Sequence, residues 1–424
     1  MLAACTDNDS FSTAIGNKLS FSEDTISFDT LFSTVPSATQ TFWVRNQSSD
    51  GIRIQTVRLE RGTQSGYRVN VDGTYLDPVG SDFEVRKGDS ILVFVEVTTR
   101  ENHVQEPQLL EDNIIFTLEN GEQQRVNLRT YSWDALKMNN LVVSRDTVIN
   151  SRVPIILYGQ GIHVDEGATL TLLDTELYFH DGAGIDVCGQ LQATGCLFRG
   201  DRLDRMFDYL PYDRISGQWR GISIASSSKY NTLADCEIRN AWDAMVCDST
   251  YLQMSNTIVH NNRGTGLTAR NSVVVLDYCQ FTNTLGDCLS LEGCEAVVDH
   301  CTIAQFYPFS ADRGAALRFT NTAQPLLLQC SNTLVTGYAD DVVMGEATDT
   351  AVVFDYRFAN CILRTDSVAD AERFERILWE TPKDSVQGKQ HFRVIDEDNL
   401  YYDFAIDSIS PAFKLDIGRQ SRKE

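Results

Sequence analysis

Residues 235–238 read Asp-Cys-Glu-Ile, and the same pattern returns as Asn-Thr-Ile-Val at 256–259, Tyr-Cys-Gln-Phe at 278–281 and His-Cys-Thr-Ile at 300–303. The offsets between these blocks are 21, 22 and 22 residues. Within each block small or apolar residues alternate with polar ones, as in a strand that buries one face. These residues therefore belong to a structural repeat.

The rest of each repeat contains a turn and two more short strands. The turn residues are Asn240, Asn261 and Asn283, and the strands are 244–247, 266–269 and 288–291 followed by 251–254, 272–275 and 295–298. These turns are too short for helices. The chain is therefore expected to wind through one rung and begin the next directly above it, with strands of successive rungs about 4.8 Å apart.

This pattern resembles the right-handed parallel β-helix family, which also contains pectin-degrading enzymes. The resemblance covers roughly residues 141–418. Gly161–Leu170 is similar to the first rungs of many β-helix proteins, and Asp403–Ala412 is similar to a segment that closes them. The resemblance implies the fold and is only weakly informative about activity.

A second domain is predicted before the repeat. About seven alternating strands, separated by turn signals such as Ser49-Asp50-Gly51, favour an antiparallel β-sandwich of the immunoglobulin-like type. We therefore predict an all-β protein. It has a tether at 1–18, the sandwich at 19–135, a right-handed parallel β-helix with inserted loops at 136–418 and a frayed tail at 419–424.

The charge of the chain limits its partners. Asp and Glu number 59 against 36 Lys and Arg, which gives a net charge of −23 and a pI of about 4.6. Nucleic acid and anionic membrane surfaces are therefore disfavoured as partners. An acidic surface that aids solubility is the simpler explanation of this charge.

The first residues, Met1-Leu2-Ala3-Ala4-Cys5, look like a bacterial lipobox, in which a signal is cleaved before a Cys that then carries lipid such as palmitate. Thr6–Asp9 resembles the acidic export signal of surface lipoproteins in the Bacteroidota. The charged and long apolar parts of a signal peptide are missing, and a chance Ala-Ala-Cys is the alternative. The resemblance implies a chain anchored through Cys5 in the bacterial outer membrane, facing the cell exterior, with membrane contact through the lipid only.

Eleven cysteines in an exported protein would usually suggest disulfides. Their placement favours another interpretation, because Cys236, Cys279 and Cys301 fall at the inward position of the repeat. Cys196, Cys330 and Cys361 occur in similar local settings. We predict reduced thiols that fill the core as Ala or Val would, although stacked neighbours would still lie within disulfide reach.

The longest insertion, residues 199–220, carries the candidate binding residues. Its density of Arg, Asp and aromatic side chains is typical of a binding hot spot or a sugar-stacking platform on a rigid scaffold. The candidates are Arg199, Asp201, Arg202, Asp204, Arg205, Tyr209, Tyr212, Asp213, Arg214 and Trp219. The alternative is that these Asp and Arg residues pair with one another while the aromatic residues cover the flank of the β-helix.

No catalytic residue, cofactor or metal ion is predicted. Enzymes of this fold need several charged side chains that project from adjacent rungs. The second strand of each repeat forms the middle strand column, and its outward positions are residues 186, 223, 246, 268, 290, 318 and 343. Only two of these positions are charged, Asp186 and Arg318. In the other column, we expect Glu237 and Arg239 to form a surface ion pair of little energetic value and His260 to be solvated.

The predicted function is a non-catalytic surface module that binds or scaffolds an outer-membrane protein complex or a glycan. One alternative is a polysaccharide lyase or glycoside hydrolase that acts on an acidic glycan with charged residues of the insertion, such as Asp201, Asp204 and Arg214. A purely structural surface protein is a further alternative. A short amphipathic helix is also predicted at 367–378.

Overall fold

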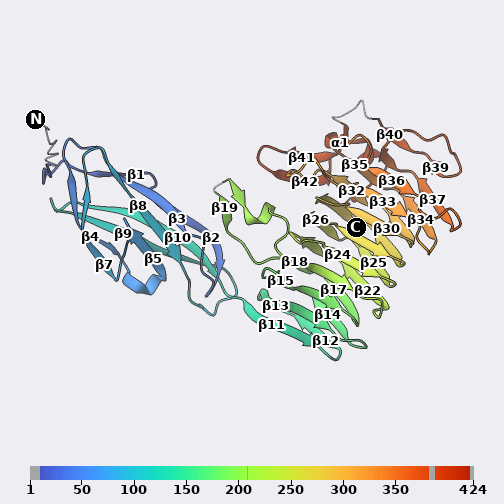
Figure 1. Cartoon of the computed structure of the whole chain (residues 1–424), viewed down its shortest axis with the longest axis horizontal. Coiled ribbons are helices and arrows are strands. Elements are labelled where there is room, and N and C mark those ends of the chain that lie inside the picture. The colour runs from blue at the N-terminus through green and yellow to red at the C-terminus, as the bar shows by residue number, and fades with distance from the viewer. Residues whose placement is uncertain (1–9, 208, 382–386, 421–424) are drawn as a thin grey trace, which may run out of the picture. The chain divides into compact units, whose positions relative to one another are not determined.

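The computed structural model describes residues 10–207, 209–381 and 387–420. The chain forms two compact units. The first comprises the chain up to Ala135 together with Arg202–Tyr212, and the second comprises Leu136–Asp201 and the chain from Asp213 onward. Both are built mainly of strands, which confirms the all-β prediction (Figure 1). Among the described residues, no helix has the length and apolar character needed to cross a membrane.

The first unit is a sandwich of two five-stranded sheets around one core. The strands alternate inward and outward side chains, as in β8, whose Ile91, Val93, Val95 and Val97 are buried. A β-sandwich forms as predicted, but it is not purely antiparallel, because β2 and β10 pair in parallel, and the immunoglobulin-like type stays a prediction. One sheet contains β1 (Leu19–Phe21), β3 (Gln40–Asn46), β8 (Ser90–Val97), β5 (Tyr67–Val71) and β6 (Thr74–Tyr75); the other contains β2 (Thr25–Phe32), β10 (Gln123–Trp133), β9 (Gln108–Leu118), β4 (Ile52–Leu59) and β7 (Val79–Val85).

Short elements complete this unit. They are the 3-10 turn η1 (Gly62–Ser65) and the antiparallel strands β19 (Arg205–Phe207) and β20 (Leu210–Pro211).

The second unit is a right-handed parallel β-helix, as the repeat predicts. Each complete rung supplies three strands, and each strand pairs in parallel with its counterpart in the next rung, which produces three ladders (Figure 1). We call these ladders A, B and C. The core between them holds the inward side chains of all three, such as Ile238, Val259 and Phe281 of ladder A.

The ladders are made of the following strands. Ladder A contains part of β13 (Ile155–Val164), then β15 (Glu176–Phe179), β18 (Leu197–Gly200), β23 (Glu237–Arg239), β26 (Ile258–Asn262), β29 (Gln280–Thr284), β32 (Thr302–Gln305), β35 (Leu334–Gly337), β38 (Ile362–Arg364) and β40 (Leu378–Glu380). Ladder B contains the rest of β13, then β16 (Gly184–Val187), β21 (Gly221–Ile224), β24 (Met245–Asp248), β27 (Leu267–Arg270), β30 (Leu289–Glu292), β33 (Leu317–Thr320) and β36 (Val343–Glu346), and β11 (Leu136–Val143) pairs along β13. Ladder C contains β12 (Thr147–Asn150), β14 (Thr169–Leu173), β17 (Gln190–Thr194), β22 (Tyr230–Ala234), β25 (Tyr251–Ser255), β28 (Val273–Asp277), β31 (Glu295–Asp299), β34 (Leu326–Ser331), β37 (Phe354–Ala359) and β39 (Phe374–Glu375).

The turn from ladder C to ladder A explains the cysteine repeat. At the eight turns between β14 and β38 one residue adopts a left-handed conformation, with φ between 44° and 66°, which Asn, Asp and Gly tolerate best. The next residue is Thr or Cys, and its side chain donates to the carbonyl oxygen two residues earlier. These residues are Thr175, Cys196, Cys236, Thr257, Cys279, Cys301, Thr333 and Cys361.

The thiols themselves are free, as predicted for the described cysteines, and all but Cys188 are buried. Cys330 differs from the prediction, because it lies in ladder C opposite Phe358 rather than in the turn column.

Residues 367–378 do not form the predicted helix. Phe374 instead pairs with Phe358 at the end of ladder C, and their rings stack with centroids 5.5 Å apart. Leu378 starts β40, which extends ladder A. The apolar side chains thus cover the last rung of the core, and this burial outweighs the local helical pattern.

A C-terminal cap lies against the outer face of ladder A. It consists of α1 (Gln387–Gln390), the antiparallel hairpin β41 (Phe392–Asp396) and β42 (Tyr401–Ile406), and α2 (Pro411–Lys414). Phe392, Phe404 and Ile406 form a separate core with Phe306 and Ile362 of the β-helix. The tail is not frayed at Arg419, whose backbone N–H donates to Thr302 Oγ1 at 2.9 Å.

Candidate functional site

A cavity of about 450 Å³ opens on the outer face of ladder A, between this face and the cap. Its floor comes from β23, β26 and β29. Its walls come from the end of the long insertion, from the loop after β32, and from the hairpin residues Leu400–Ala405. The lining residues are Asp213, Arg214, Glu237, Arg239, Ile258, His260, Asn261, Gln280, Asn283, Pro308, Phe309, Leu400, Tyr401, Tyr402, Asp403, Phe404, Ala405 and Arg419.

Strand periodicity places the charged floor residues outward. Ile238 and Val259 point into the core, so the side chains on either side of them face the cavity. Glu237 is in register with Ile258, and Arg239 with His260. Residues of adjacent rungs are thereby brought side by side about 4.8 Å apart.

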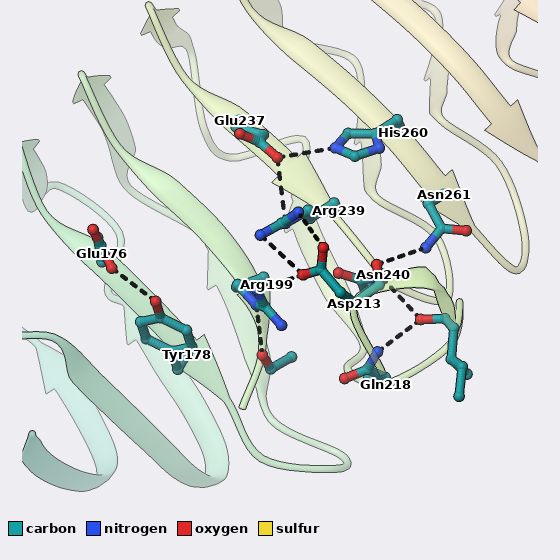
Figure 2. A network of polar contacts seen from close by, with 12 residues as sticks. Glu176, Tyr178, Arg199, Asp213, Gln218, Glu237, Arg239, Asn240, His260 and Asn261 are labelled. Carbon is teal, nitrogen blue, oxygen red and sulfur yellow. Dashed lines mark hydrogen bonds and ion pairs between the residues drawn. The ribbon is translucent and has the colours of Figure 1, made fainter. Parts of the chain in front are cut away.

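Asp213 lies between two guanidinium groups in this site. Its carboxylate accepts from Arg199 Nη1 at 2.7 Å and lies 3.2 Å from Arg239 Nη2 (Figure 2). The loop that carries Asp213 is fixed by Asn240, whose amide donates to the carbonyl oxygens of Asp213 and Ile215. Burial, followed by the charge of Arg239, lowers the pKa of Arg199, so Asp213 compensates two closely spaced cations.

Glu237 is the second anion of this network. Its Oε1 lies 3.0 Å from His260 Nε2 and 3.3 Å from Arg239 Nε (Figure 2). Burial alone would raise the pKa of Glu237. The hydrogen bond from His260 and the charges of His260, Arg239 and Arg199 outweigh burial and lower this pKa to about 2. Glu237 is therefore a carboxylate across the physiological pH range.

These contacts confirm one expectation and correct two others. The Glu237–Arg239 pair forms as predicted. His260 is not a solvated residue, because only 27% of its side chain is exposed and Glu237 pairs with it. The expectation that charged groups would not converge is also wrong, since the insertion and the C-terminal segment bring Asp213, Arg214, Asp403 and Arg419 to the cavity on ladder A.

The charged positions of ladder B do not add to the cavity. Asp186 is held by Arg220 at 2.6 Å, and Arg318 is held by Asp287 at 2.6 Å. The position that follows Arg318 in this column is Met344 rather than residue 343, because the inserted loop between the rungs obscures the register in the sequence.

Aromatic side chains form part of the rim. Phe309 is 45% exposed and Tyr401 is 52% exposed, and two further lining residues, Tyr402 and Phe404, stack on one another with centroids 5.9 Å apart. Gln280, Asn261 and Asn283 supply amide groups at the floor. A cavity with exposed rings and several directed polar groups is suited to a polar ligand that also has flat apolar faces.

Among the candidates from the insertion, Asp213 and Arg214 line the cavity and Arg199 lies buried behind Asp213. Arg214 Nη1 donates to the carbonyl oxygen of Asn399 in the hairpin loop. Trp219 cannot contact a partner, because it is fully buried, stacks on Phe179 at 4.2 Å and donates to the Arg239 carbonyl oxygen.

The remaining candidates lie outside the cavity lining. Asp201 Oδ2 lies 2.7 Å from His180 Nδ1. In the first compact unit, Arg202 binds both carboxylate oxygens of Asp204 and lies over the ring of Tyr212. Arg205 pairs with Asp29 at 3.1 Å, and Tyr209 is exposed and stacks on Phe207. The alternative in which Asp and Arg residues of the insertion pair with one another thus describes Arg199, Arg202, Asp204 and Asp213.

Sequence reasoning missed the cap residues that complete the site. Leu400–Ala405 and Arg419 belong to a segment interpreted only as the closure of the β-helix and as a tail. The signal that could have indicated them is the run Tyr401-Tyr402-Asp403-Phe404, which is richer in aromatic residues than closure of a core requires.

One group of side chains could hold a cation outside the cavity. Ligand atoms of Asp277, Asp299 and His300 lie within 4.8 Å of one another. Ser331 and Asn332 donate to Asp299 Oδ1, and His300 Nδ1 lies 2.9 Å from Asp299 Oδ2. Burial opposes these hydrogen bonds, but together with the charge of His300 they lower the pKa of Asp299. These bonds account for the arrangement without an ion.

Comparison with known proteins identifies residues 136–303 as a right-handed β-helix region. A search of curated proteins gives no match. Solved structures with partial likeness are a family 123 glycoside hydrolase from Clostridium perfringens (7% identity, TM-score 0.21, 30% of this chain and 30% of that chain), the Dettilon tailspike protein (9%, 0.22, 58% and 62%) and Dex49A from Penicillium minioluteum (6%, 0.17, 84% and 70%). The chain spans less than two thirds of the hydrolase and of the tailspike. TM-scores of this size carry no argument about activity.

Proposed function

We propose that this protein binds a glycan without turning it over, and that the cavity on ladder A is the binding site. The observation that carries the proposal is the combination of the exposed rings of Phe309 and Tyr401 with the ordered polar floor below them. Sugars have apolar faces and hydroxyl edges, so rings and amides together match both parts of a glycan.

The ion-pair network favours binding over hydrolysis. A glycoside hydrolase needs one carboxyl group that is protonated near neutral pH and can serve as general acid. Glu237 has a pKa of about 2, and Asp213 is held by Arg199 and Arg239. These two acids are therefore fixed as partners of cations, which leaves them poorly placed to donate a proton, and the third acid of the lining, Asp403, accepts from the backbone N–H of Ala405.

The second candidate is a polysaccharide lyase or glycoside hydrolase that acts on an acidic glycan. Its support is the convergence of Asp213, Glu237 and His260 on one cavity. Asp201 and Asp204, which this alternative invoked from the sequence, are not among the cavity-lining residues and have the partners described above.

We further propose that the chain is a lipoprotein of the bacterial outer membrane, anchored through Cys5, facing the exterior and able to associate with an outer-membrane protein complex. Cys5 lies outside the described residues. The support for this part of the proposal is the lipobox-like sequence around Cys5.

The test is to measure binding and turnover on the same glycans. Purified protein is applied to an array of neutral and acidic polysaccharides, and each glycan that binds is then incubated with it and analysed for shortened or unsaturated products. Binding without products is the expected result. Products that depend on Glu237 or His260 would favour the enzyme, and binding to none of the glycans would reject the proposed function.

A further inference from the structure

Arg419 differs from Arg239 and His260, two other cations of the cavity, in what surrounds its side chain. Arg239 faces two carboxylates, and His260 faces Glu237. The guanidinium of Arg419 donates to the amide oxygen of Asn256 at 2.9 Å, and within the described part of the chain it has no carboxylate at ion-pair distance. Its Nε is buried and has no acceptor among the described residues.

The backbone holds Arg419 in this position. The N–H of Gly418 donates to the Asn332 carbonyl oxygen, and the N–H of Arg419 donates to Thr302 Oγ1. The turn residue Asn332 and Thr302 of β32 therefore fix where the side chain leaves the backbone. The position of the Arg419 side chain is therefore set by hydrogen bonds to the β-helix.

The side chain lies where two hollows meet. The cavity described above and a neighbouring hollow of about 400 Å³ share Glu237, Ile258 and Arg419. The acids beside Arg419 are already engaged, since Asp235 accepts from Asn256 at 2.6 Å and Glu237 pairs with His260 and Arg239. A partly buried cation that has no counter-ion among the described residues is unfavourable, and burial lowers the pKa of Arg419 accordingly.

We propose that Arg419 is the anion receptor of the glycan site and that the ligand carries a carboxylate or sulfate group on a sugar ring. This inference rests on the proposed function and adds the chemical class of the ligand. The Nε is buried and out of reach of a ligand, and Nη2 already donates to Asn256, so the remaining Nη–H donors of the planar guanidinium are the ones that a carboxylate or sulfate would accept from. The ligand thus supplies a negative charge that the described residues do not place beside Arg419.

The experiment compares polygalacturonate, dextran sulfate and uncharged dextran as ligands of the full chain, by calorimetry. Wild type is expected to bind one of the two anionic polymers at least tenfold more tightly than dextran, and which one binds distinguishes carboxylate from sulfate. Arg419→Gln should lose at least tenfold in affinity for that polymer, while Arg419→Lys should lose less, because it keeps the charge and loses the paired donors.

The matched control is Arg270→Gln, which removes an exposed Arg of ladder B that pairs with Glu292 and lies outside both hollows. It should bind as wild type does. Thermal unfolding of each variant separates lost binding from lost folding. Equal affinity for dextran and the anionic polymers, or unchanged affinity in Arg419→Gln, would overturn the inference and leave the proposed glycan site standing. Absence of binding to all three polymers and to the wider array would reject both.

Discussion

His260 Nε2 lies 3.0 Å from Glu237 Oε1, although the two residues belong to successive rungs and are 23 positions apart in the chain. Both side chains line the charged cavity on ladder A, and neither lies in a motif that marks it as a site residue in the sequence. It exists because ladder A places Glu237, Arg239 and His260 on adjacent outward positions. The same pairing makes the stability of the β-helix depend on pH.

We expect Glu237→Gln to remove a pH-dependent part of the stability. The folded pKa of about 2 lies below the ordinary value of 4.5. The contribution of Glu237 is thus complete above about pH 4.5 and is lost as the pH falls toward about 2. The difference in free energy of unfolding between wild type and Glu237→Gln should shrink across that window in denaturant titrations. A difference that stays constant between pH 6 and pH 2.5 would contradict the assignment.

The rim aromatic residues should be required for glycan binding. Tyr401→Ala and Phe309→Ala each remove an exposed ring from the cavity, and we expect each to weaken binding at least tenfold, about 1.4 kcal/mol. Tyr230→Ala is the matched control, because Tyr230 is similarly exposed but stacks on Tyr251 in ladder C, away from the cavity lining. Calorimetry with the glycan identified on the array measures all three. Equal losses in Tyr230→Ala and Tyr401→Ala would show that the rings have no specific role.

Much of the fold was predictable from the repeat, and most of the site was not. The 21- and 22-residue offsets gave the ladder register of Glu237, Arg239 and His260, because strand pairing between rungs depends only on rung length. The partners Asp213 and Tyr401 come from an insertion and from the cap, neither of which has a period. Their positions depend on tertiary contacts such as those of Asn240, and no local pattern encodes these contacts. The helix predicted at 367–378 was wrong for the same reason.

Trp219 should behave as a core residue rather than as a binding residue. Trp219→Ala removes a fully buried ring that stacks on Phe179, and we expect it to destabilise the fold by about 3–5 kcal/mol. Trp242→Ala, which removes a half-exposed ring beside Arg263, should cost about 1 kcal/mol or less. Chemical denaturation compares the two variants. Similar midpoints would contradict the core assignment of Trp219.

The turn column should accept Thr in place of Cys. Cys279→Thr keeps the donor to the carbonyl oxygen of Asp277, as Thr257 does one rung earlier, whereas Cys279→Val keeps the shape and loses the donor. We expect the Val variant to be less stable than the Thr variant by about 0.5–1.5 kcal/mol. Urea denaturation under reducing conditions measures this difference, and equal stability would show that the donor contributes nothing.

The buried thiols of the core should resist chemical modification. Burial raises the pKa of Cys247 and of Cys288 to about 12, and thiolates are the reactive species. Among the described cysteines, only the half-buried Cys188 is expected to react quickly with a thiol reagent in the native state. Mass spectrometry of the labelled protein identifies the modified positions, and early labelling of Cys247 would contradict the packing.

The cap should depend on a buried acid that lies outside the cavity. Glu380 is 1% exposed and accepts from Thr336 Oγ1 at 2.6 Å. Its carboxylate also lies 2.7 Å from His391 Nε2. The other ring nitrogen of His391, Nδ1, lies 2.6 Å from the Oγ of Ser410, which is the N-cap of α2. Glu380→Ala leaves His391 buried without its partner, a loss of about 3–5 kcal/mol. The loss falls on the segment from His391 to Ser410, which includes the cavity wall Leu400–Ala405. We therefore expect protease cleavage within 391–410 and loss of glycan binding, while the far-ultraviolet spectrum of the β-helix persists. The control is Glu375→Ala, which removes a half-exposed acid that pairs with Arg357 and should change neither protease cleavage nor glycan binding. If Glu380→Ala resists the protease as well as wild type does, the apolar contacts of Phe392 and Phe404 hold the cap in place without Glu380.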